Sequence, residues 1–140
     1  MAYMETAMSL LGGCCCGAVR YETSEQVFHQ TICHCPTCRR ACGAPNVAWF
    51  SVARWEYRVT AGTPVQFHSS TDVTRTFCGA CGTQLTYAHD GSPDEIDVTT
   101  CSLDNAETLA PLDHTFTFYR LPWDTGEDGT PQYLRTRSEG

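Results

Sequence analysis

The chain is organised around the stretch Cys33-His34-Cys35-Pro36-Thr37-Cys38-Arg39-Arg40, which places three thiols within six residues and two guanidiniums directly after them. Cysteine thiolates are zinc ligands, and four of them close a tetrahedral site whereas three leave one position open. The stretch therefore predicts a metal site that can accept a ligand from outside the chain.

Two further pairs of cysteines flank this stretch, Cys14-x-Cys16 and Cys78-x-x-Cys81. A glycine follows the second cysteine of each pair, where a metal-binding turn often needs a positive φ that glycine adopts freely. The pairs therefore look like matched halves of one four-thiol site that joins the first strand to a hairpin starting at Thr83. The alternatives are buried thiols that act as small apolar groups, and an iron ion in place of zinc.

The three thiols of the central stretch need a fourth ligand if their site is to be closed. Cys42, Cys101 or a distant histidine could supply it, and the zinc would then be structural and the protein a binding module. If none does, the zinc with three thiolates carries a formal charge of about -1. Such a zinc is a weak Lewis acid for carbonyls and a soft partner for sulfur, so the open site predicts a thiol substrate.

Composition excludes several function classes. The 140 residues carry a formal net charge of -7, which argues against a nucleic-acid partner or an anionic membrane surface. All nine basic residues are arginine, so chemistry that needs a lysine amine is excluded. Ten cysteines without an export signal favour metal binding in a reducing compartment, and we expect a cytoplasmic protein.

Short runs of β-branched and aromatic residues predict an all-β fold. No window of about eleven residues keeps a helical stripe, so at most a turn of helix is expected, after Cys38 or around Leu103 to Thr108. Strands are expected at Ala18 to Glu22, Val27 to Ile32, Val47 to Val52, Trp55 to Thr60, Val65 to Phe67, Val73 to Phe77, Thr83 to Tyr87, Ile96 to Thr100 and Thr115 to Tyr119.

Turn residues and terminal composition set the expected boundaries. The turn Ala61-Gly62-Thr63-Pro64 lies between two alternating runs and predicts a hairpin. We expect a disordered N-terminal segment over residues 1–11, one zinc-binding domain over 12–133 and a frayed tail over 134–140.

Together these motifs resemble the glutathione-dependent formaldehyde-activating enzyme family, which includes centromere protein V. The resemblance covers Gly12 to about Tyr133. It is carried by Gly13 to Tyr21, Cys33 to Arg39, Phe77 to Thr83, Val98 to Asp104, Pro111-x-x-His114, Trp123 and Asp128-Gly129-x-Pro131.

The resemblance implies a β-tent fold of short antiparallel sheets held by zinc knuckles, and two zinc ions. One is structural on Cys14, Cys16, Cys78 and Cys81, and the other is catalytic on Cys33, Cys35 and Cys38. It implies a carbon–sulfur lyase-type reaction in which glutathione and formaldehyde form S-hydroxymethylglutathione. The alternative is a non-catalytic two-zinc scaffold for a protein partner. Cys42 and Cys101 stand where the family usually has small residues, and either could add a ligand.

Few other polar residues are predicted to serve the site. Arg39 places a positive charge next to the open zinc, where it could hold a carboxylate of glutathione, and Arg40 is a second candidate. His34 lies between two ligands and is expected to point away from the metal. Three other histidines have no partner at ligand spacing and are expected to be ordinary surface or core side chains: His68, His89 and His114.

Overall fold

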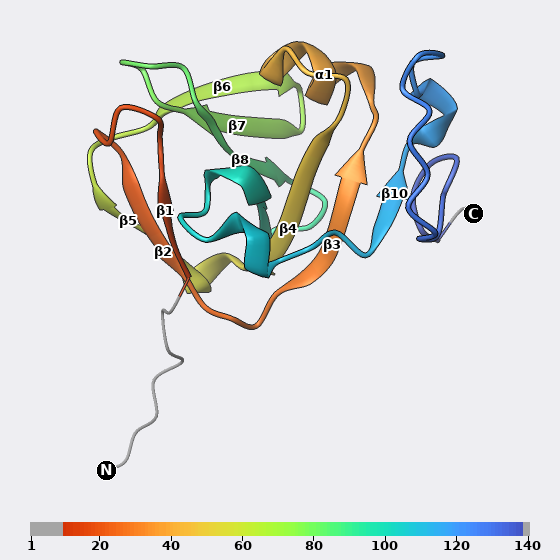
Figure 1. The fold of residues 1–140 in the computed structure, drawn as a ribbon. Coiled ribbons are helices and arrows are strands. Elements are labelled where there is room, and N and C mark those ends of the chain that lie inside the picture. The colour runs from red at the N-terminus through yellow and green to blue at the C-terminus, as the bar shows by residue number, and fades with distance from the viewer. Residues whose placement is uncertain (1–9, 139–140) are drawn as a thin grey trace.

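The computed structural model describes residues 10–138, which form two β-sheets and one short helix (Figure 1). A three-stranded sheet has the order β1-β2-β5, and a seven-stranded sheet has the order β10-β3-β4-β9-β8-β7-β6. The elements are β1 Leu10–Gly13, β2 Arg20–Thr23, β3 Phe28–Cys33, α1 Pro36–Cys42, β4 Val47–Ala53, β5 Tyr57–Ala61, β6 Val65–Ser70, β7 Val73–Phe77, β8 Gln84–His89, β9 Glu95–Thr99 and β10 Asp113–Thr115. Four 3-10 turns lie at Arg54–Glu56, Thr100–Ser102, Ala106–Thr108 and Thr117–Tyr119.

The predicted fold class is confirmed, because the chain is mostly β-sheet with a single short helix within residues 10–138. The helix differs from the expectation, since α1 spans seven residues and begins at Pro36, before Cys38. Proline suits the first helical position, and the Cys35 side chain caps this end by accepting a hydrogen bond from Cys38 N. Gly43, with φ 60°, ends the helix.

The hairpin predicted across residues 61–64 is wrong. β5 pairs with β2 in the small sheet, whereas β6 pairs with β7 in the large one. The chain changes sheets at Gly62, whose φ is 78° and where a Cβ would lie 2.2 Å from the carbonyl oxygen of Ala18. The turn residues therefore mark a crossing between sheets.

The observed boundaries extend the ordered domain at both ends. Leu10 and Leu11, which were assigned to the disordered segment, pair with β2 as part of β1, and residues 1–9 lie outside the described range. The C-terminal tail is not frayed through residue 137, because Phe116 N donates to Arg135 O and Arg137 pairs with Asp113.

The strand expected over residues 115–119 is shorter than predicted. β10 ends at Thr115, and Phe116 adopts the left-handed region with φ 57°. A 3-10 turn follows at Thr117–Tyr119. The pairing of β10 with β3 is parallel, which adds the C-terminal part of the chain to the edge of the large sheet beside Cys33.

The hydrophobic core lies between the two sheets. Tyr21 of the small sheet packs there with Phe50 and Val52 of β4, and with side chains of β8 and β9. Side chains alternate along β4, so Trp49 and Ser51 lie on the opposite face and are also buried. The centre of the large sheet is therefore covered on both faces, and its far face is where the central cysteines lie.

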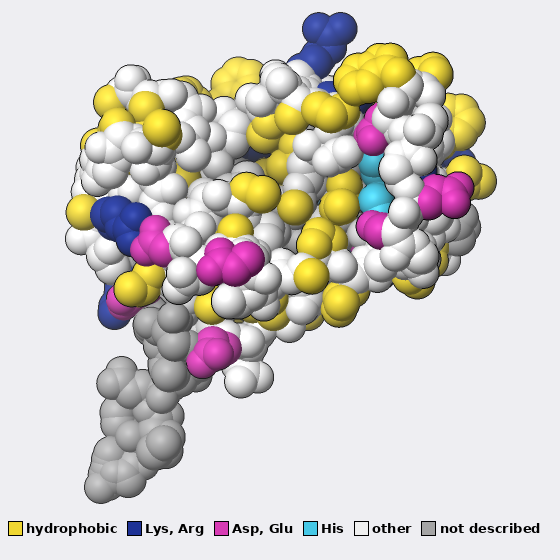
Figure 2. Space-filling model, in the orientation of Figure 1, with side chains coloured by type: hydrophobic (Ala, Val, Ile, Leu, Met, Phe, Trp, Pro, Cys, Tyr) yellow, Lys and Arg dark blue, Asp and Glu magenta, His cyan; other side chains and the backbone are white. Residues whose placement is uncertain are grey.

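Charged side chains are spread over the surface. On the face drawn in Figure 2, basic groups stand singly, and several acidic groups lie between hydrophobic ones. Histidine side chains are visible at one place on this face, beside the C-terminal segment.

Among the residues described, no helix has the length and apolar character needed to cross a membrane.

Candidate metal sites and the adjoining cavity

The two flanking cysteine pairs meet in space. The sulfurs of Cys14, Cys16, Cys78 and Cys81 all lie within 4.8 Å of one another, with 3.6 Å between Cys14 and Cys16 and 3.8 Å between Cys16 and Cys78. A zinc ion bound tetrahedrally at about 2.3 Å separates its sulfurs by about 3.8 Å, whereas a disulfide needs about 2.05 Å. All ten cysteines are free thiols, so this geometry fits a metal ion.

Hydrogen bonds favour the thiolate form of two thiols in this four-thiol cluster, Cys14 and Cys81, whereas the neighbouring thiols raise the pKa of Cys16 to about 11. Val19 N donates to Cys14 Sγ at 3.2 Å, and this backbone contact lowers the pKa of Cys14. The hydroxyl of Thr83 lies 3.2 Å from Cys81 Sγ and, with the backbone of the same residue, lowers the pKa of Cys81 to about 5. Thiolates are the form that binds zinc, so the surroundings suit a metal.

The four-thiol cluster links the two sheets. Cys14 and Cys16 lie in the β1–β2 connection, and Cys78 and Cys81 lie between β7 and β8. The glycines that follow each pair have φ of 80° and 82°, as predicted from the sequence: these are Gly17 and Gly82. A metal here would hold the small sheet against the large one.

The central cysteines form a second cluster in which three sulfurs lie within 4.8 Å of one another. Cys33 ends β3 and Cys38 lies in α1, both buried, while Cys35 precedes the helix and is half-buried. Hydrogen bonds from the Cys33 and Cys38 side chains lower the pKa of Cys35 to about 2, and the same contact with Cys35 raises the pKa of Cys33. The donor set therefore fits a soft divalent cation such as zinc.

No fourth ligand joins these three within residues 10–138. Cys42, the last residue of α1, packs beside the cluster, but its sulfur is not among those within 4.8 Å of one another. Cys101 is exposed in the Thr100–Ser102 turn and does not belong to the cluster. The geometry thus leaves the three-thiol site open.

The open site lies in the wall of a cavity of about 540 Å³. The floor of this cavity is a row of side chains on paired strands, in which Ser51 of β4 faces Asp97 of β9, Asp97 faces Tyr87 of β8, and Tyr87 faces Arg75 of β7. Such cavities suit small molecules, because apolar walls combine with a few fixed polar groups.

Arg75 places a positive charge in this cavity without a carboxylate partner, unlike Arg137, which pairs with Asp113, and the sequence analysis missed it. The side chain is 2% exposed, and its Nη2 lies 3.6 Å from Cys38 Sγ. The signal was present, since Arg75 stands between Val73 and Phe77 on one face of an alternating strand, where a charge is unexpected. Arg39 and Arg40 lie on α1 and are not among the cavity-lining residues, and their role in substrate binding stays a prediction.

Asp97 brings a carboxyl group to the same floor. Ser51 Oγ donates a hydrogen bond to it at 2.6 Å. Burial nevertheless raises the pKa of Asp97 to about 6. The cavity therefore has a cation at Arg75 and, two strands away, a carboxyl group whose pKa is raised by burial.

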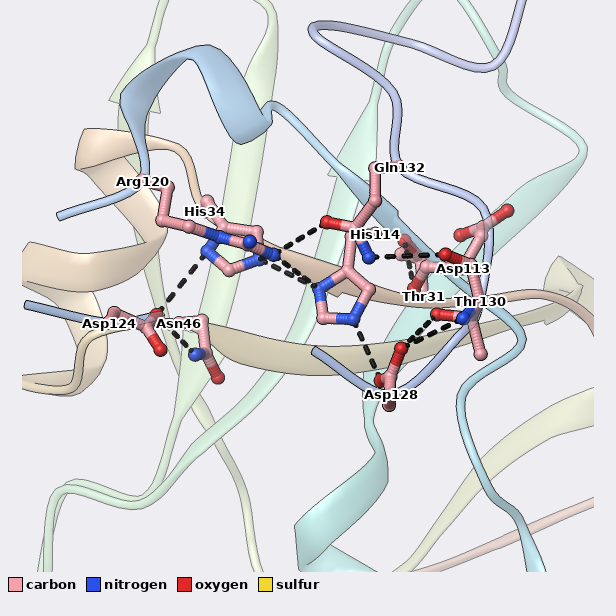
Figure 3. A network of polar contacts seen from close by, with 10 residues as sticks. All are labelled: Thr31, His34, Asn46, Asp113, His114, Arg120, Asp124, Asp128, Thr130 and Gln132. Atoms are coloured by element: carbon pink, nitrogen blue, oxygen red, sulfur yellow. Dashed lines mark hydrogen bonds and ion pairs between the residues drawn. The ribbon is translucent and has the colours of Figure 1, made fainter. Parts of the chain in front are cut away.

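His34 is buried, and its ring lies against His114 and near Asp124 and Arg120 (Figure 3). Its Nε2 lies 2.9 Å from His114 Nδ1, and His114 Nε2 lies 2.9 Å from a carboxylate oxygen of Asp128. Asp124 lies 3.6 Å from the other ring nitrogen of His34. This network fastens the cysteine loop to the C-terminal segment.

The three other histidines are surface or core side chains and belong to neither cysteine cluster. His114 is buried with a partner on each ring nitrogen, and His68 and His89 are exposed. His29, with φ 53°, and Phe116 are the non-glycine residues of positive φ in the described part of the chain, and both line the cavity. Backbone strain of this kind is concentrated at functional sites.

Comparisons with known proteins agree with this geometry. The sequence model of the glutathione-dependent formaldehyde-activating enzyme family matches residues 9–118. An uncharacterized lyase of Schizosaccharomyces pombe is 32% identical over 78 residues, which is 56% of this chain and 56% of the lyase.

A crystal structure of a Rhodobacter sphaeroides protein is similar with a TM-score of 0.60 and 23% identity, covering 87% of this chain and 98% of that one. At this identity the likeness supports the fold alone.

Proposed function

Because the chain belongs to the glutathione-dependent formaldehyde-activating enzyme family, we propose that it binds glutathione or a similar small thiol and forms or releases its aldehyde adduct, as a carbon–sulfur lyase does. The observation that carries this proposal is the convergence of Cys33, Cys35 and Cys38 on a cavity where residues 10–138 provide no fourth ligand. The name of the S. pombe relative, a lyase, agrees with this reaction class.

The two clusters have different roles in this proposal. A zinc ion held by Cys33, Cys35 and Cys38 would supply a fourth position at which a thiol binds as its thiolate. The four-thiol cluster does not line the cavity, and we assign it a structural zinc. The ten free thiols favour a reducing compartment, so we place the protein in the cytoplasm.

The chain itself contributes binding and orientation. Trp49 and Tyr87 line the cavity with flat aromatic rings, and Arg75 adds a positive charge beside Cys38. Addition of a thiol to formaldehyde is intrinsically easy, so holding the two reactants together in a fixed orientation is the main task. No strong base is required, because a thiol that binds as thiolate has already lost its proton.

Cobalt substitution tests this function directly. Cobalt in the three-thiol site gives a sulfur-to-metal absorption that grows with each thiolate, so glutathione should raise it to saturation. S-methylglutathione has no thiol and should leave the spectrum unchanged, and Cys35→Ala should remove the response. If glutathione changes nothing in the wild type but does so in Cys42→Ser, then Cys42 closes the site, the lyase proposal is wrong and the protein is a scaffold.

A further inference from the structure

Arg75 is a buried cation without a counter-carboxylate. Its side chain is 2% exposed, and none of the ion pairs among residues 10–138 includes it. The aromatic rings of Tyr87 and Trp49 lie 5.0 Å and 6.0 Å from its guanidinium carbon, which offsets part of the desolvation. Burying a charge is costly unless it is paired, and the thiol group of Cys38, whose Sγ lies 3.6 Å from Nη2, is the nearest group that can carry a compensating negative charge.

The nitrogens of this guanidinium are not equivalent. Nε donates to Ser69 Oγ at 3.0 Å, and Nη2 donates to Cys38 Sγ at 3.6 Å. Nη1 is buried and has no hydrogen-bond partner in the part of the chain that the structure describes. The first two contacts and the aromatic rings fix the plane of the group, so Nη1 is a pre-positioned donor next to the open three-thiol site.

A ligand oxygen on Nη1 would give a partner to the nitrogen that has none. Nε and Nη2 already donate to Ser69 and Cys38, so one oxygen atom is enough to leave each of the three nitrogens with an acceptor. The oxygen of a thiol–aldehyde adduct is one atom, two bonds from the sulfur. A ligand sulfur bound at the open position of the three-thiol site, beside Cys38, would therefore bring that oxygen close to Arg75.

The charge of the site gives the reason for such a donor. Three thiolates around one zinc leave about -1 in total, so the metal polarises a carbonyl weakly. The oxygen that becomes negative when sulfur adds to the aldehyde needs positive charge from elsewhere. Resting on the function proposed above, we propose that Arg75 is a catalytic residue whose Nη1 binds this oxygen, both in the developing alkoxide and in the adduct.

The reaction balances without another reagent. The thiol first releases its proton to solvent, and the thiolate lone pair then forms the carbon–sulfur bond while the carbonyl π electrons move to oxygen. The oxygen takes up one proton from solvent, which gives a neutral hydroxymethyl thioether. Arg75 keeps its charge throughout, because a guanidinium is not deprotonated in proteins, and acts only as a hydrogen-bond donor.

Two ligands that differ by one oxygen test the assignment. S-methylglutathione ends in S–CH₃, and glutathione with excess formaldehyde gives the adduct ending in S–CH₂–OH. Their binding to the zinc-loaded protein is followed by the fluorescence of Trp49, which is 5% exposed and lines the cavity, whereas Trp55 and Trp123 are exposed. The chain has no lysine, so formaldehyde meets few reactive amines.

The wild type should bind the adduct about tenfold or more tightly than S-methylglutathione, the ratio expected for one hydrogen bond from a charged donor. Arg75→Gln should retain binding of S-methylglutathione and lose most of this ratio. It should also slow the exchange between free and adducted formaldehyde, measured by NMR, about 100-fold, with little change in the KM for glutathione. Arg58→Gln is the matched control, because Arg58 is an exposed residue paired with Glu22, and it should leave the ratio unchanged.

Arg75→Lys keeps the buried charge and covers the case in which Arg75→Gln fails to fold. A lysine has one nitrogen and cannot contact Ser69, Cys38 and the ligand oxygen in the same planar arrangement, so the ratio should fall here too. An unchanged ratio in Arg75→Lys or Arg75→Gln overturns the assignment. If the wild type binds neither glutathione nor the adduct, the proposed function itself has failed, which is a different result.

Discussion

At the scale of single residues, Asp97 is a carboxyl group of the cavity whose protonation depends on its burial. Burial raises its pKa from 3.8 to about 6 despite the hydrogen bond from Ser51. The folded protein therefore holds a proton that the unfolded chain releases between these values. Because the native state binds more protons, the free energy of unfolding should fall as pH rises from about 4 to about 6, and stay lower above that.

Asp97→Asn should remove the fall in the free energy of unfolding with rising pH, because asparagine does not titrate. Its amide oxygen still accepts the hydrogen bond from Ser51. At pH 7.5 we expect the free energy of unfolding to rise by up to about 3 kcal/mol, because each pKa unit corresponds to about 1.4 kcal/mol. At pH 3.5 the difference should almost vanish. Urea unfolding at both pH values measures the effect, and Glu107→Gln, an exposed change, serves as control. Equal gains at the two pH values would contradict this account.

Residues of the site differ in how well the sequence predicts them. All seven cysteines that the spacing assigned to the two sites come together. Short turns fix the cysteines within each motif, and the two matched Cys-Gly pairs indicated the link across 62 residues. Arg75 could not be assigned to the site, since its position depends on the order of strands in the sheet and on contacts with Cys38, 37 residues away. The link from His34 to His114 spans 80 residues and was likewise out of reach of local patterns.

At the scale of elements, the two glycines of the four-thiol site allow a clean test of backbone strain. Gly17 and Gly82 have φ of 80° and 82°, and a Cβ added at either would meet nothing within 4 Å. An alanine there would cost only the strain of the left-handed conformation, about 1 kcal/mol. Thermal unfolding of the zinc-loaded Gly17→Ala and Gly82→Ala variants should show this loss.

Gly126→Ala is the matched control for these variants. Gly126 also has open space around its Cβ position, but its φ does not lie in the positive range. It should leave the melting temperature almost unchanged. Loss of the same size in all three variants would mean that the glycines of the knuckles are not selected for their backbone conformation.

The sequence predicts the bounds of a strand well where alternating residues and turns mark them. It does not predict which strand pairs with which. Val73 to Phe77 matches β7 at both ends, because alternation and flanking turns mark it. The hairpin across residues 61–64 failed because a turn sequence gives no information on whether the next strand returns beside the last one. Helix α1 was underestimated because its capping and packing beside the cysteines replace the helical stripe that a free helix would need.

At the scale of the whole molecule, the two cysteine clusters occupy different places in the fold. The four-thiol cluster joins the β1–β2 connection to the β7–β8 connection, and so ties the two sheets together across the core. The three-thiol cluster spans the end of β3, the short connection after it and the start of α1, and the histidine network also holds this connection to the C-terminal segment. Loss of metal should therefore have unequal consequences at the two sites.

Metal content and unfolding together test this division. Purified protein should carry close to two zinc ions per chain, since two clusters have the donor geometry for one each. Cys35→Ala should remove one zinc and leave a folded domain, because β3 stays paired with β4 and β10 without it. Cys14→Ala should unfold the chain, because a structural zinc contributes on the order of 10 kcal/mol to the folded state.

Elemental analysis gives the zinc count, and circular dichroism with urea unfolding gives the state of the fold. Cys15→Ala is the control for the structural site, since this exposed thiol lies between two ligands but outside the cluster, and it should keep both zinc ions. Equal damage from Cys14→Ala and Cys35→Ala would contradict the separate roles. A folded Cys14→Ala variant that has lost one zinc would show instead that the hydrophobic core holds the two sheets together without the metal.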